Sequence, residues 1–224
     1  MTGSCKLSTT QILSAILVII IIGTLTAYAY TNANDALKDS VKKGMKSTVG
    51  VMATQINASD ITGFKPGDET SPAYLAVTRE MRNMRSMDDR ILNAYILKVN
   101  PDKSITFLVD DLSEYDPQGS AKIGEVSTSP DAIEIFSALS GPTASSAPYT
   151  TKYGSFISAY APIDDSSIGS SGNTRAILAI DMSAADYNQY TSKGVLILLT
   201  GIVAIIIAVG AIFWFGRRDE KKVG

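Results

Sequence analysis

The side chains of this chain that could do chemistry are carboxylates and tyrosines, because none of its 224 residues is a histidine. A Ser-His-Asp triad is therefore excluded, and so is a metal site that relies on imidazole. A phosphate-accepting histidine is excluded as well, so the chain is not itself a histidine kinase. The sequence also lacks a Gly-rich phosphate loop with its lysine. We therefore expect no enzymatic activity and no cofactor.

Carboxylates occur at three places where they could act. Asp110-Asp111 and Asp164-Asp165 are adjacent pairs beside loops, and such pairs are usually solvated turn residues. Asp181 differs, because it ends an almost wholly apolar run, where an unpaired carboxylate is costly to bury. For Asp181 a ligand role and the capping of a following helix both remain open.

Charge and cysteine content narrow the class of partner. Of the 20 basic and 22 acidic residues, five basic and two acidic ones lie in the terminal tails, so the region between carries about −5, which does not suit nucleic acid. The single Cys5 precedes the first apolar run, so it is neither a disulfide partner nor a lipoprotein cysteine. At roughly 160 residues, the central region is long enough to bury a core of its own.

Two apolar runs bracket the chain. The first extends from Ile12 to about Ala29, and the second, from Val195 to Phe215, contains no charge. Each is close to the ~20 residues that a helix needs to cross a bilayer core. The predicted division is a tail at 1–10, a transmembrane helix at 11–30, a domain at 31–193, a second transmembrane helix at 194–215 and a basic tail at 216–224.

The basic residues near the ends predict the orientation. Lys6 precedes the first run, and four basic residues follow the second within 217–222. Because positive charge stays on the cytoplasmic side, we expect a two-pass plasma-membrane protein with both termini in the cytoplasm and the domain outside. The alternative for the first run is a cleaved signal peptide, with Ala27-Tyr28-Ala29 as the cleavage sequence. The second run would still anchor the domain.

Two helices are predicted at the start of the domain. Apolar residues from Leu37 to Ile56 recur every three or four positions, which indicates an amphipathic helix that continues from the first transmembrane helix. Ser71-Pro72 predicts the start of a second helix, with Ser71 as its cap. Three arginines of that helix lie away from its apolar stripe: Arg79, Arg82 and Arg85. We interpret them as a face exposed to solvent, and the alternative is that one of them contacts an anionic ligand.

Five strands are predicted after these helices. Asn100-Pro101-Asp102-Lys103 is a turn sequence that indicates a hairpin between the first two strands. A short helix capped at Ser129-Pro130 follows, and a polar tip at 164–173 precedes the last strand, which we expect to be central in the sheet. The predicted strands are 91–99, 104–109, 149–153, 155–162 and 175–181. Together these elements indicate an α+β domain with an antiparallel sheet.

Several segments of the domain form a recognisable set. One group comprises Ser71-Pro72-Ala73-Tyr74, Ile91-Leu92-Asn93-Ala94-Tyr95 and Phe107-Leu108-Val109-Asp110. The most specific part is Ser158-Ala159-Tyr160-Ala161-Pro162-Ile163, followed by the strand that ends in Asp181. Together these segments resemble the extracellular Cache (PAS-like, also called PDC) sensor family. The length accommodates one lobe, so the resemblance implies a single Cache domain. It also implies a five-stranded antiparallel sheet with a long N-terminal helix behind it.

The resemblance further implies a ligand site. Four residues match the strand positions that face the ligand in the family: Tyr95, Asp110, Tyr160 and Asp181. A carboxylate pairs with an ammonium group and a phenol bonds to a ligand oxygen, so this set favours an amino acid or amine over a purely anionic carboxylate. The alternatives are ordinary core aromatics at Tyr95 and Tyr160 and a turn cap at Asp110.

Sensing through a separate partner is the expected function, because the nine residues after Phe215 are too few for an output module. The expected partners are a small-molecule ligand, membrane lipid, a second copy of the chain, and a histidine kinase or chemoreceptor. Ser183-Ala184-Ala185-Asp186 indicates a helix start that leads into the second transmembrane helix. Ligand contact at Asp181 is thus expected to displace that helix by ~1–2 Å. The alternative function is a surface-binding or accessory structural module without a signalling role.

Overall fold

A computed structural model describes residues 8–163 and 175–223, without the side chains of Lys193 and 215–223. The expectations about Cys5, Lys6, Asp164-Asp165, the polar tip at 164–173 and the side chains of the basic tail therefore lie outside the described residues. The chain divides into two compact units. One, which we call the lobe, is Asp39–Tyr190, and the other, the helical pair, is Met1–Lys38 with Thr191–Gly224.

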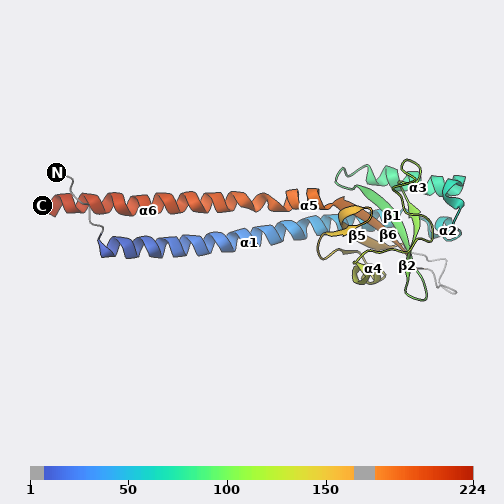
Figure 1. The fold of residues 1–224 in the computed structure, drawn as a ribbon, viewed down its shortest axis with the longest axis horizontal. Coiled ribbons are helices and arrows are strands. Elements are labelled where there is room, and N and C mark those ends of the chain that lie inside the picture. The colour runs from blue at the N-terminus through green and yellow to red at the C-terminus, as the bar shows by residue number, and fades with distance from the viewer. Residues whose placement is uncertain (1–7, 164–174, 224) are drawn as a thin grey trace. The chain divides into compact units, whose positions relative to one another are not determined.

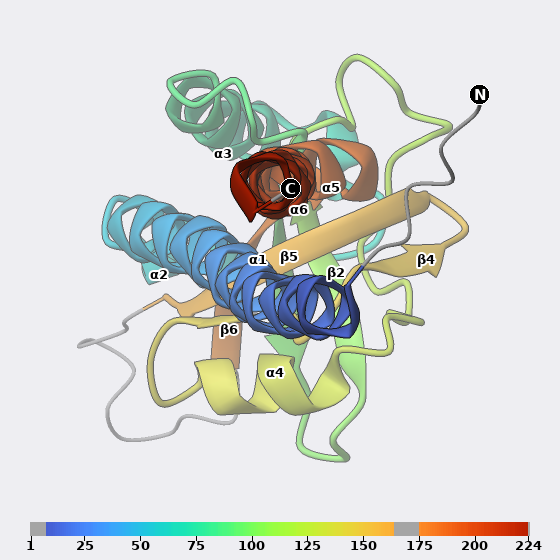
Figure 2. The same ribbon diagram turned by 90° about the vertical axis from the view of Figure 1, so that its left-hand side faces the viewer.

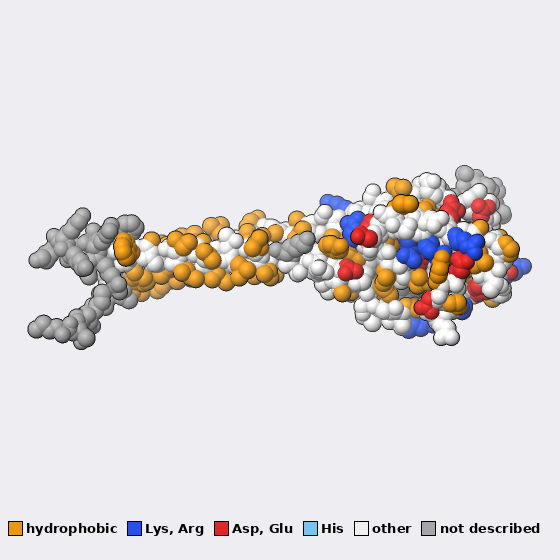
Figure 3. Space-filling view, turned by 90° about the horizontal axis from the view of Figure 1, so that it is seen from above, with side chains coloured by type: hydrophobic (Ala, Val, Ile, Leu, Met, Phe, Trp, Pro, Cys, Tyr) orange, Lys and Arg blue, Asp and Glu red, His pale blue; other side chains and the backbone are white. Residues whose placement is uncertain are grey.

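The helical pair contains the apolar parts of two long helices. Helix α1 (Thr9–Ala53) includes an 18-residue window with a mean hydropathy of 2.5, and a helical run over Ala184–Trp214, which includes most of α6 (Val195–Val223), reaches 3.0. Their apolar side chains are exposed, for example Leu13 at 62% and Leu196 at 69%, and Figure 3 shows such side chains along the helices. A core helix of a soluble protein would bury these groups. Both helices therefore have the length and surface of transmembrane helices.

Small residues let the two helices of the pair approach closely. A Cβ atom added to Gly201 would overlap the side chain of Thr26, and one added to Gly194 would overlap Asn34. Close backbone approach at small residues is a common way for helices to pack in a bilayer.

The described part of the lobe combines short helices with six strands. The two cores described below contain most of its buried apolar side chains. After α1 its elements are α2 (Ala58–Ile61), the 3₁₀ turn η1 (Asp68–Thr70), α3 (Pro72–Arg85), β1 (Asn93–Val99), β2 (Ile105–Asp110), α4 (Ala132–Ala138), β3 (Thr143–Ala144), β4 (Tyr149–Thr151), β5 (Gly154–Pro162), β6 (Arg175–Ser183) and α5 (Ala184–Thr191). The 3₁₀ turn η2 (Ser192–Gly194) follows in the helical pair.

All strand pairs are antiparallel, and the sheet order is β2-β1-β6-β5-β3, with β4 pairing to β5. The predicted α+β class, the five predicted strands, the hairpin and the central position of the last strand are confirmed. The sequence did not predict β3. Its two residues pair with Tyr160 and Ala159 of β5, so β3 depends on a neighbouring strand rather than on its own pattern.

Helices cover both faces of the sheet. On one face, Met45, Val49 and Met52 of α1 pack with residues of α2 and α3 in the larger apolar core. On the other face, Ile135 and Ala138 of α4 pack with residues of β1 and β6. Figures 1 and 2 show α3 and α4 on opposite sides of the strands. The expected long N-terminal helix behind the sheet is therefore present, although it ends at Ala53 rather than near Ile56.

Two of the three predicted helix starts are correct in detail. Ser71 Oγ accepts from the backbone N–H of Tyr74 at 3.2 Å, and Ser183 Oγ accepts from that of Asp186 at 3.1 Å. The prediction that Ser129 caps the short helix is wrong. The N-cap of α4 is Asp131, and Ser129 Oγ instead accepts from the N–H of Asp131 in the preceding turn.

Candidate ligand-binding site

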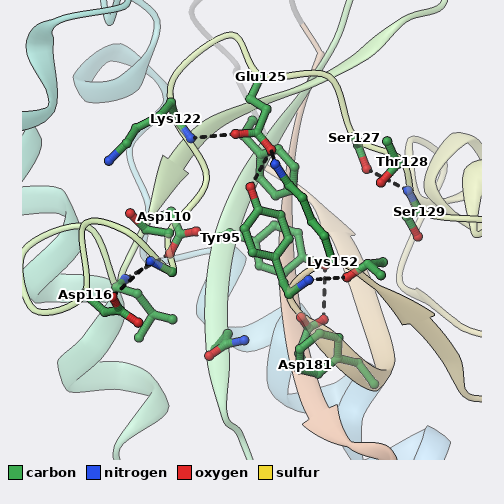
Figure 4. Close-up of a pocket in the computed structure, with 18 of the residues that line it drawn as sticks. Tyr95, Asp110, Asp116, Lys122, Glu125, Ser127, Thr128, Ser129, Lys152 and Asp181 are labelled. Atoms are coloured by element: carbon green, nitrogen blue, oxygen red, sulfur yellow. Dashed lines mark hydrogen bonds and ion pairs between the residues drawn. The ribbon is translucent and has the colours of Figure 1, made fainter.

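A cavity of about 770 Å³ opens on the face of the sheet that α4 also covers. Its walls come from β1, β2, β4, β5 and β6, from the end of α3 and from the long segment between β2 and α4, and Figure 4 shows side chains from several of these elements around the cavity. This volume lies within the range of small-molecule sites. Three of the four predicted site residues line it: Tyr95, Asp110 and Asp181.

Asp181 lines the cavity and is only 4% exposed. Its Oδ1 accepts from Ser158 Oγ at 2.5 Å and from Tyr95 Oη at 3.1 Å. Its Oδ2 has no hydrogen-bond partner among the described residues. Burial raises the pKa of Asp181 to about 7, although the bonds from Ser158 and Tyr95 lower it. Asp181 therefore presents one oxygen that a ligand could bind, and in the absence of a ligand the carboxyl is partly protonated near neutral pH.

The antiparallel register explains why these groups meet. Asp181 of β6 stands opposite Asn93 of β1 on one side and opposite Ser158 of β5 on the other. Tyr95 is two residues after Asn93, and alternate residues of a strand point to the same face. The ring of Tyr95 also lies 5.4 Å from that of Phe107, and burial raises the pKa of its phenol well above the usual value. Tyr95 is therefore a neutral donor to Asp181.

Asp110 lines the cavity, but both of its carboxylate oxygens bind backbone groups. Oδ1 accepts from the N–H of Leu112 at 2.9 Å, and Oδ2 accepts from that of Ala121 at 2.8 Å. Burial raises the pKa of Asp110 to about 6 in spite of these bonds. The contacts agree with the alternative that Asp110 caps the turn after β2, and a ligand role for it remains a prediction.

Tyr160 is fully buried and is not among the residues that line the cavity. Its hydroxyl donates to Asp131 Oδ2 at 3.0 Å and lies 3.3 Å from the hydroxyl of Tyr149, which does line the cavity. The structure thus does not bring Tyr160 to the predicted site. The contacts agree with the alternative of a core tyrosine whose hydroxyl is satisfied.

The cations around the cavity already have partners in the lobe. Lys152 Nζ lies 2.9 Å from Glu125 Oε1, and Arg85 Nε is paired with Asp111 Oδ2. Lys122 Nζ donates to the carbonyl of Pro117 at 2.6 Å. The carboxylate of Asp181, in contrast, has no ion pair among the described residues.

The arginines of α3 hold the segment after β2 that forms one wall. Arg79 and Arg82 both pair with Glu114, Arg82 also lies 3.9 Å over the ring of Tyr115, and Arg85 binds the buried Asp111. The interpretation as a solvated face was wrong for Arg82 and Arg85, whose side chains are 17% and 19% exposed. Their anions are carboxylates of the lobe itself, because the chain after β2 folds back over α3.

Sequence reasoning missed several polar residues of the site. Ser158 lies two residues before Tyr160 on β5, so the alternation of that strand gave a signal for it. Lys152, Glu125 and Ser120 come from irregular segments, for which no periodicity exists. Ser120 Oγ is notable, because it is buried at the cavity without a hydrogen-bond partner among the described residues.

The arrangement suits binding. Among the described residues, no group of three or more aspartate, glutamate or cysteine side chains is placed to hold a metal ion. The cavity offers an acidic acceptor in Asp181, an unpartnered hydroxyl in Ser120, an amide in Asn93 and aromatic walls.

No protein-family model matches this chain. No curated protein matches it either. Among solved structures, the sensor domain of DcuS from E. coli is similar, with a TM-score of 0.45 and 11% identity over 70% of this chain and 99% of that one. The fold assignment therefore depends on the strand order and the helices described above.

Proposed function

We propose that this chain is a membrane-anchored sensor whose lobe, a single Cache-type domain outside the plasma membrane, binds a small molecule. The supporting features are two helices of transmembrane length, an α+β lobe between them, and a cavity of about 770 Å³ lined by convergent polar groups. Occupancy of the cavity would be passed to a separate partner such as a histidine kinase or chemoreceptor.

The observation that carries this proposal is the state of Asp181. It is nearly buried, two hydroxyls hold one of its oxygens, and the other oxygen has no partner among the described residues. An ionised carboxylate in such surroundings is unfavourable unless a cation or a donor meets it. A bound ligand that supplies this group would gain binding energy there.

Charge favours an amino-bearing ligand. Two of the three cations that line the cavity, Lys152 and Arg85, are neutralised by Glu125 and Asp111, so an anion would compete with existing pairs there. The third, Lys122, donates to a neutral carbonyl and would suit the carboxylate of an amino acid. An ammonium group would instead pair with Asp181, with Tyr95 and Asn93 beside it. Ser120 Oγ would bond to a second polar group of the ligand. The ligand class is thus an amine or amino acid.

The signal would pass along the chain from the site. Asp181 is near the end of β6, and α5 begins three residues later with Ser183 as its cap. We propose that pairing at Asp181 alters the end of β6 and displaces the second transmembrane helix by ~1–2 Å, the scale of helix shifts in known switches.

A thermal-shift screen of the full-length, detergent-solubilised chain tests this function. The panel contains amino acids, aliphatic mono- and diamines, and dicarboxylates. We expect at least one amino-bearing compound to raise the melting temperature saturably, following RT ln(1 + [L]/Kd). No saturable shift with any compound, or shifts with dicarboxylates alone, would overturn the proposal.

Two variants sharpen the screen. Asp181→Asn removes the charge while keeping the shape, and we expect the Kd to rise about tenfold to a hundredfold because a charge-assisted bond is lost. Asp116→Asn is the matched control, because Asp116 lines the same cavity but is exposed and accepts from the nearby N–H of Gly119. Its Kd should stay within about twofold of the wild-type value.

A further inference from the structure

A short segment at the sheet edge contacts α1 within the lobe. We call residues 142–146 the α1-contact segment; it contains β3 and ends at Ser146. A Cβ atom added to Gly50 of α1 would lie 3.3 Å from Pro142 Cγ, and Lys42 Nζ of α1 donates to the carbonyl of Ser146 at 2.5 Å. Any displacement of the segment would therefore change its contacts with α1 at two positions, Lys42 and Gly50, which are eight residues apart.

Ser145 holds this segment to β5. It is fully buried, and its N–H donates to the carbonyl of Ser158 at 2.8 Å. The N–H of Ser158 in turn donates to Ser145 Oγ at 2.9 Å, and Ser145 Oγ donates to Asp131 Oδ2. These bonds are buried, and buried hydrogen bonds that share a group strengthen or weaken one another. A change in one bond of this set therefore alters the others.

Ser158 also belongs to the cavity end of this chain of contacts. Its hydroxyl donates to Asp181 Oδ1 at 2.5 Å, while its backbone binds Ser145. An acceptor that carries a full charge binds a hydroxyl more strongly than a neutral one does. A change in the charge state of Asp181 therefore changes the strength of the hydrogen bond from Ser158.

We propose that Ser158 and Ser145 are positioning residues that relay the charge state of Asp181 to α1 through the α1-contact segment. The role of the relay in signalling rests on the proposed function, since a cationic ligand would set that charge state. The relay is a route to the first long helix, separate from the route along β6 to α5. Its residues lie within the lobe, and it needs no movement between the two units of the chain.

Hydrogen exchange with mass spectrometry on the full-length chain in lipid nanodiscs tests the relay without any added compound. The probe is Asp181→Asn, which keeps the carboxyl site neutral. The comparison is made at pH 8, where wild-type Asp181 is mostly ionised. We expect the exchange rates of peptides covering 142–146 and 42–52 to differ about threefold or more between the variant and the wild type. A change of this size corresponds to the weakening of one buried hydrogen bond. Asp89→Asn is the control, because Asp89 is exposed and does not line the cavity, and it should leave both peptides unchanged.

A double-variant cycle separates a relay from general destabilisation. If Ser158→Ala breaks the relay, adding Asp181→Asn to it produces no further change in the 42–52 peptides. Additive effects would mean that the two residues act independently and would overturn the proposal. So would an Asp181→Asn variant whose α1 peptides exchange as in the wild type.

A second variant protects the test against a failure to fold. If Asp181→Asn does not fold, Ser145→Ala replaces it, because this variant removes the Ser145 hydroxyl from its contact with Ser158 without altering the cavity. It should change the exchange rate of the 42–52 peptides. Unchanged exchange there would overturn the relay. Because no compound is added, a negative result here leaves the ligand screen intact, and a negative screen leaves the relay intact.

Discussion

At the scale of single residues, the proposed function depends on Asp181. Three strands bury it, and burial raises its pKa to about 7, whereas in an unfolded chain an Asp titrates near 4. Its contribution to stability is therefore fully present below about pH 4 and is lost as the pH rises through about 7. Ionisation of Asp181 at neutral pH thus lowers the stability of the lobe, and a cationic ligand paired with the carboxylate would offset this loss.

This linkage gives the first prediction. Asp181→Asn is neutral at every pH, so it should melt near the wild-type temperature at pH 4 and several degrees higher at pH 8, a difference of about 1–3 kcal/mol. The measurement is the melting temperature of both full-length proteins at intervals between pH 4 and pH 8. A difference that stays constant over this range would show that Asp181 does not titrate as described.

The sequence singled out Asp181, and the resemblance added Tyr95, which donates to it, but neither indicated Ser158. A lone carboxylate at the end of an apolar strand is conspicuous, because burying it is costly. For Ser158 the only signal was its alternation with Tyr160 along one strand, which is weak because hydroxyl residues are common in strands and a sequence does not show what they face. Tyr160 was placed by resemblance, and the structure instead puts its hydroxyl on Asp131. The bonds of Asp110 depend on where the chain goes after β2, which no local pattern states.

At the scale of elements, the α3 arginines fix one wall of the site. Asp111 has a side chain that is 0% exposed, and burial raises its pKa while the bond from Arg85 lowers it. Removing Arg85 would leave a buried carboxylate without its cation, and this kind of loss is strongly destabilising. Arg79, at 57% exposed, holds Glu114 from the solvent side, where ion pairs contribute little.

The second prediction compares these two arginines. Arg85→Ala should lower the free energy of unfolding by about 3 kcal/mol, whereas Arg79→Ala should cost less than about 1 kcal/mol. Thermal melting of the two full-length variants measures the difference. Equal losses would show that the buried pair does not hold the wall.

The third prediction concerns the packing of the two long helices. Gly201→Val places side-chain atoms where Thr26 stands, while Gly210→Val meets no heavy atom within 4 Å of its Cβ. Ala29 and Ile197 line one groove between the helices, so cysteines there should form a disulfide in a Cys5→Ser background. Gly201→Val should strongly reduce this cross-linking, and Gly210→Val should leave it unchanged. Equal cross-linking in both variants would contradict the close approach at Gly201.

Elements with strong local signals were predicted well. Ser71 and Pro72 marked the start of α3, and the turn at 100–103 marked the hairpin. β3 was missed because two residues carry no periodicity. The arginines were misinterpreted for a related reason: a helical pattern shows which side chains lie off the apolar stripe, but not which distant segment will cover them.

At the scale of the whole molecule, the account requires the lobe to lie outside the membrane. Exposed apolar side chains on two long helices suit lipid, and the basic residues after the second helix favour a cytoplasmic C-terminus. Length and hydropathy predicted the two long apolar helices, and the orientation inferred from the basic residues stays a prediction. The sequence could not supply the cavity, which arises where five strands and a long irregular segment meet.

The fourth prediction tests this topology. Protease added to intact cells should cut the lobe and leave a fragment that carries a C-terminal tag. The lobe should be cut equally in cells whose membrane is intact and in permeabilised cells. A lobe that survives in intact cells and disappears only after permeabilisation would place it in the cytoplasm and contradict the sensor account.

The central claim is that the cavity binds an amino-bearing molecule through Asp181, and isothermal titration calorimetry tests it most directly. The amine or amino acid with the largest thermal shift is titrated into the full-length chain in nanodiscs. The account predicts saturable binding at one site per chain, with a Kd about tenfold to a hundredfold higher for Asp181→Asn and nearly unchanged for Asp116→Asn. Saturable binding that is equally strong in all three proteins, or no binding in any of them, would contradict it.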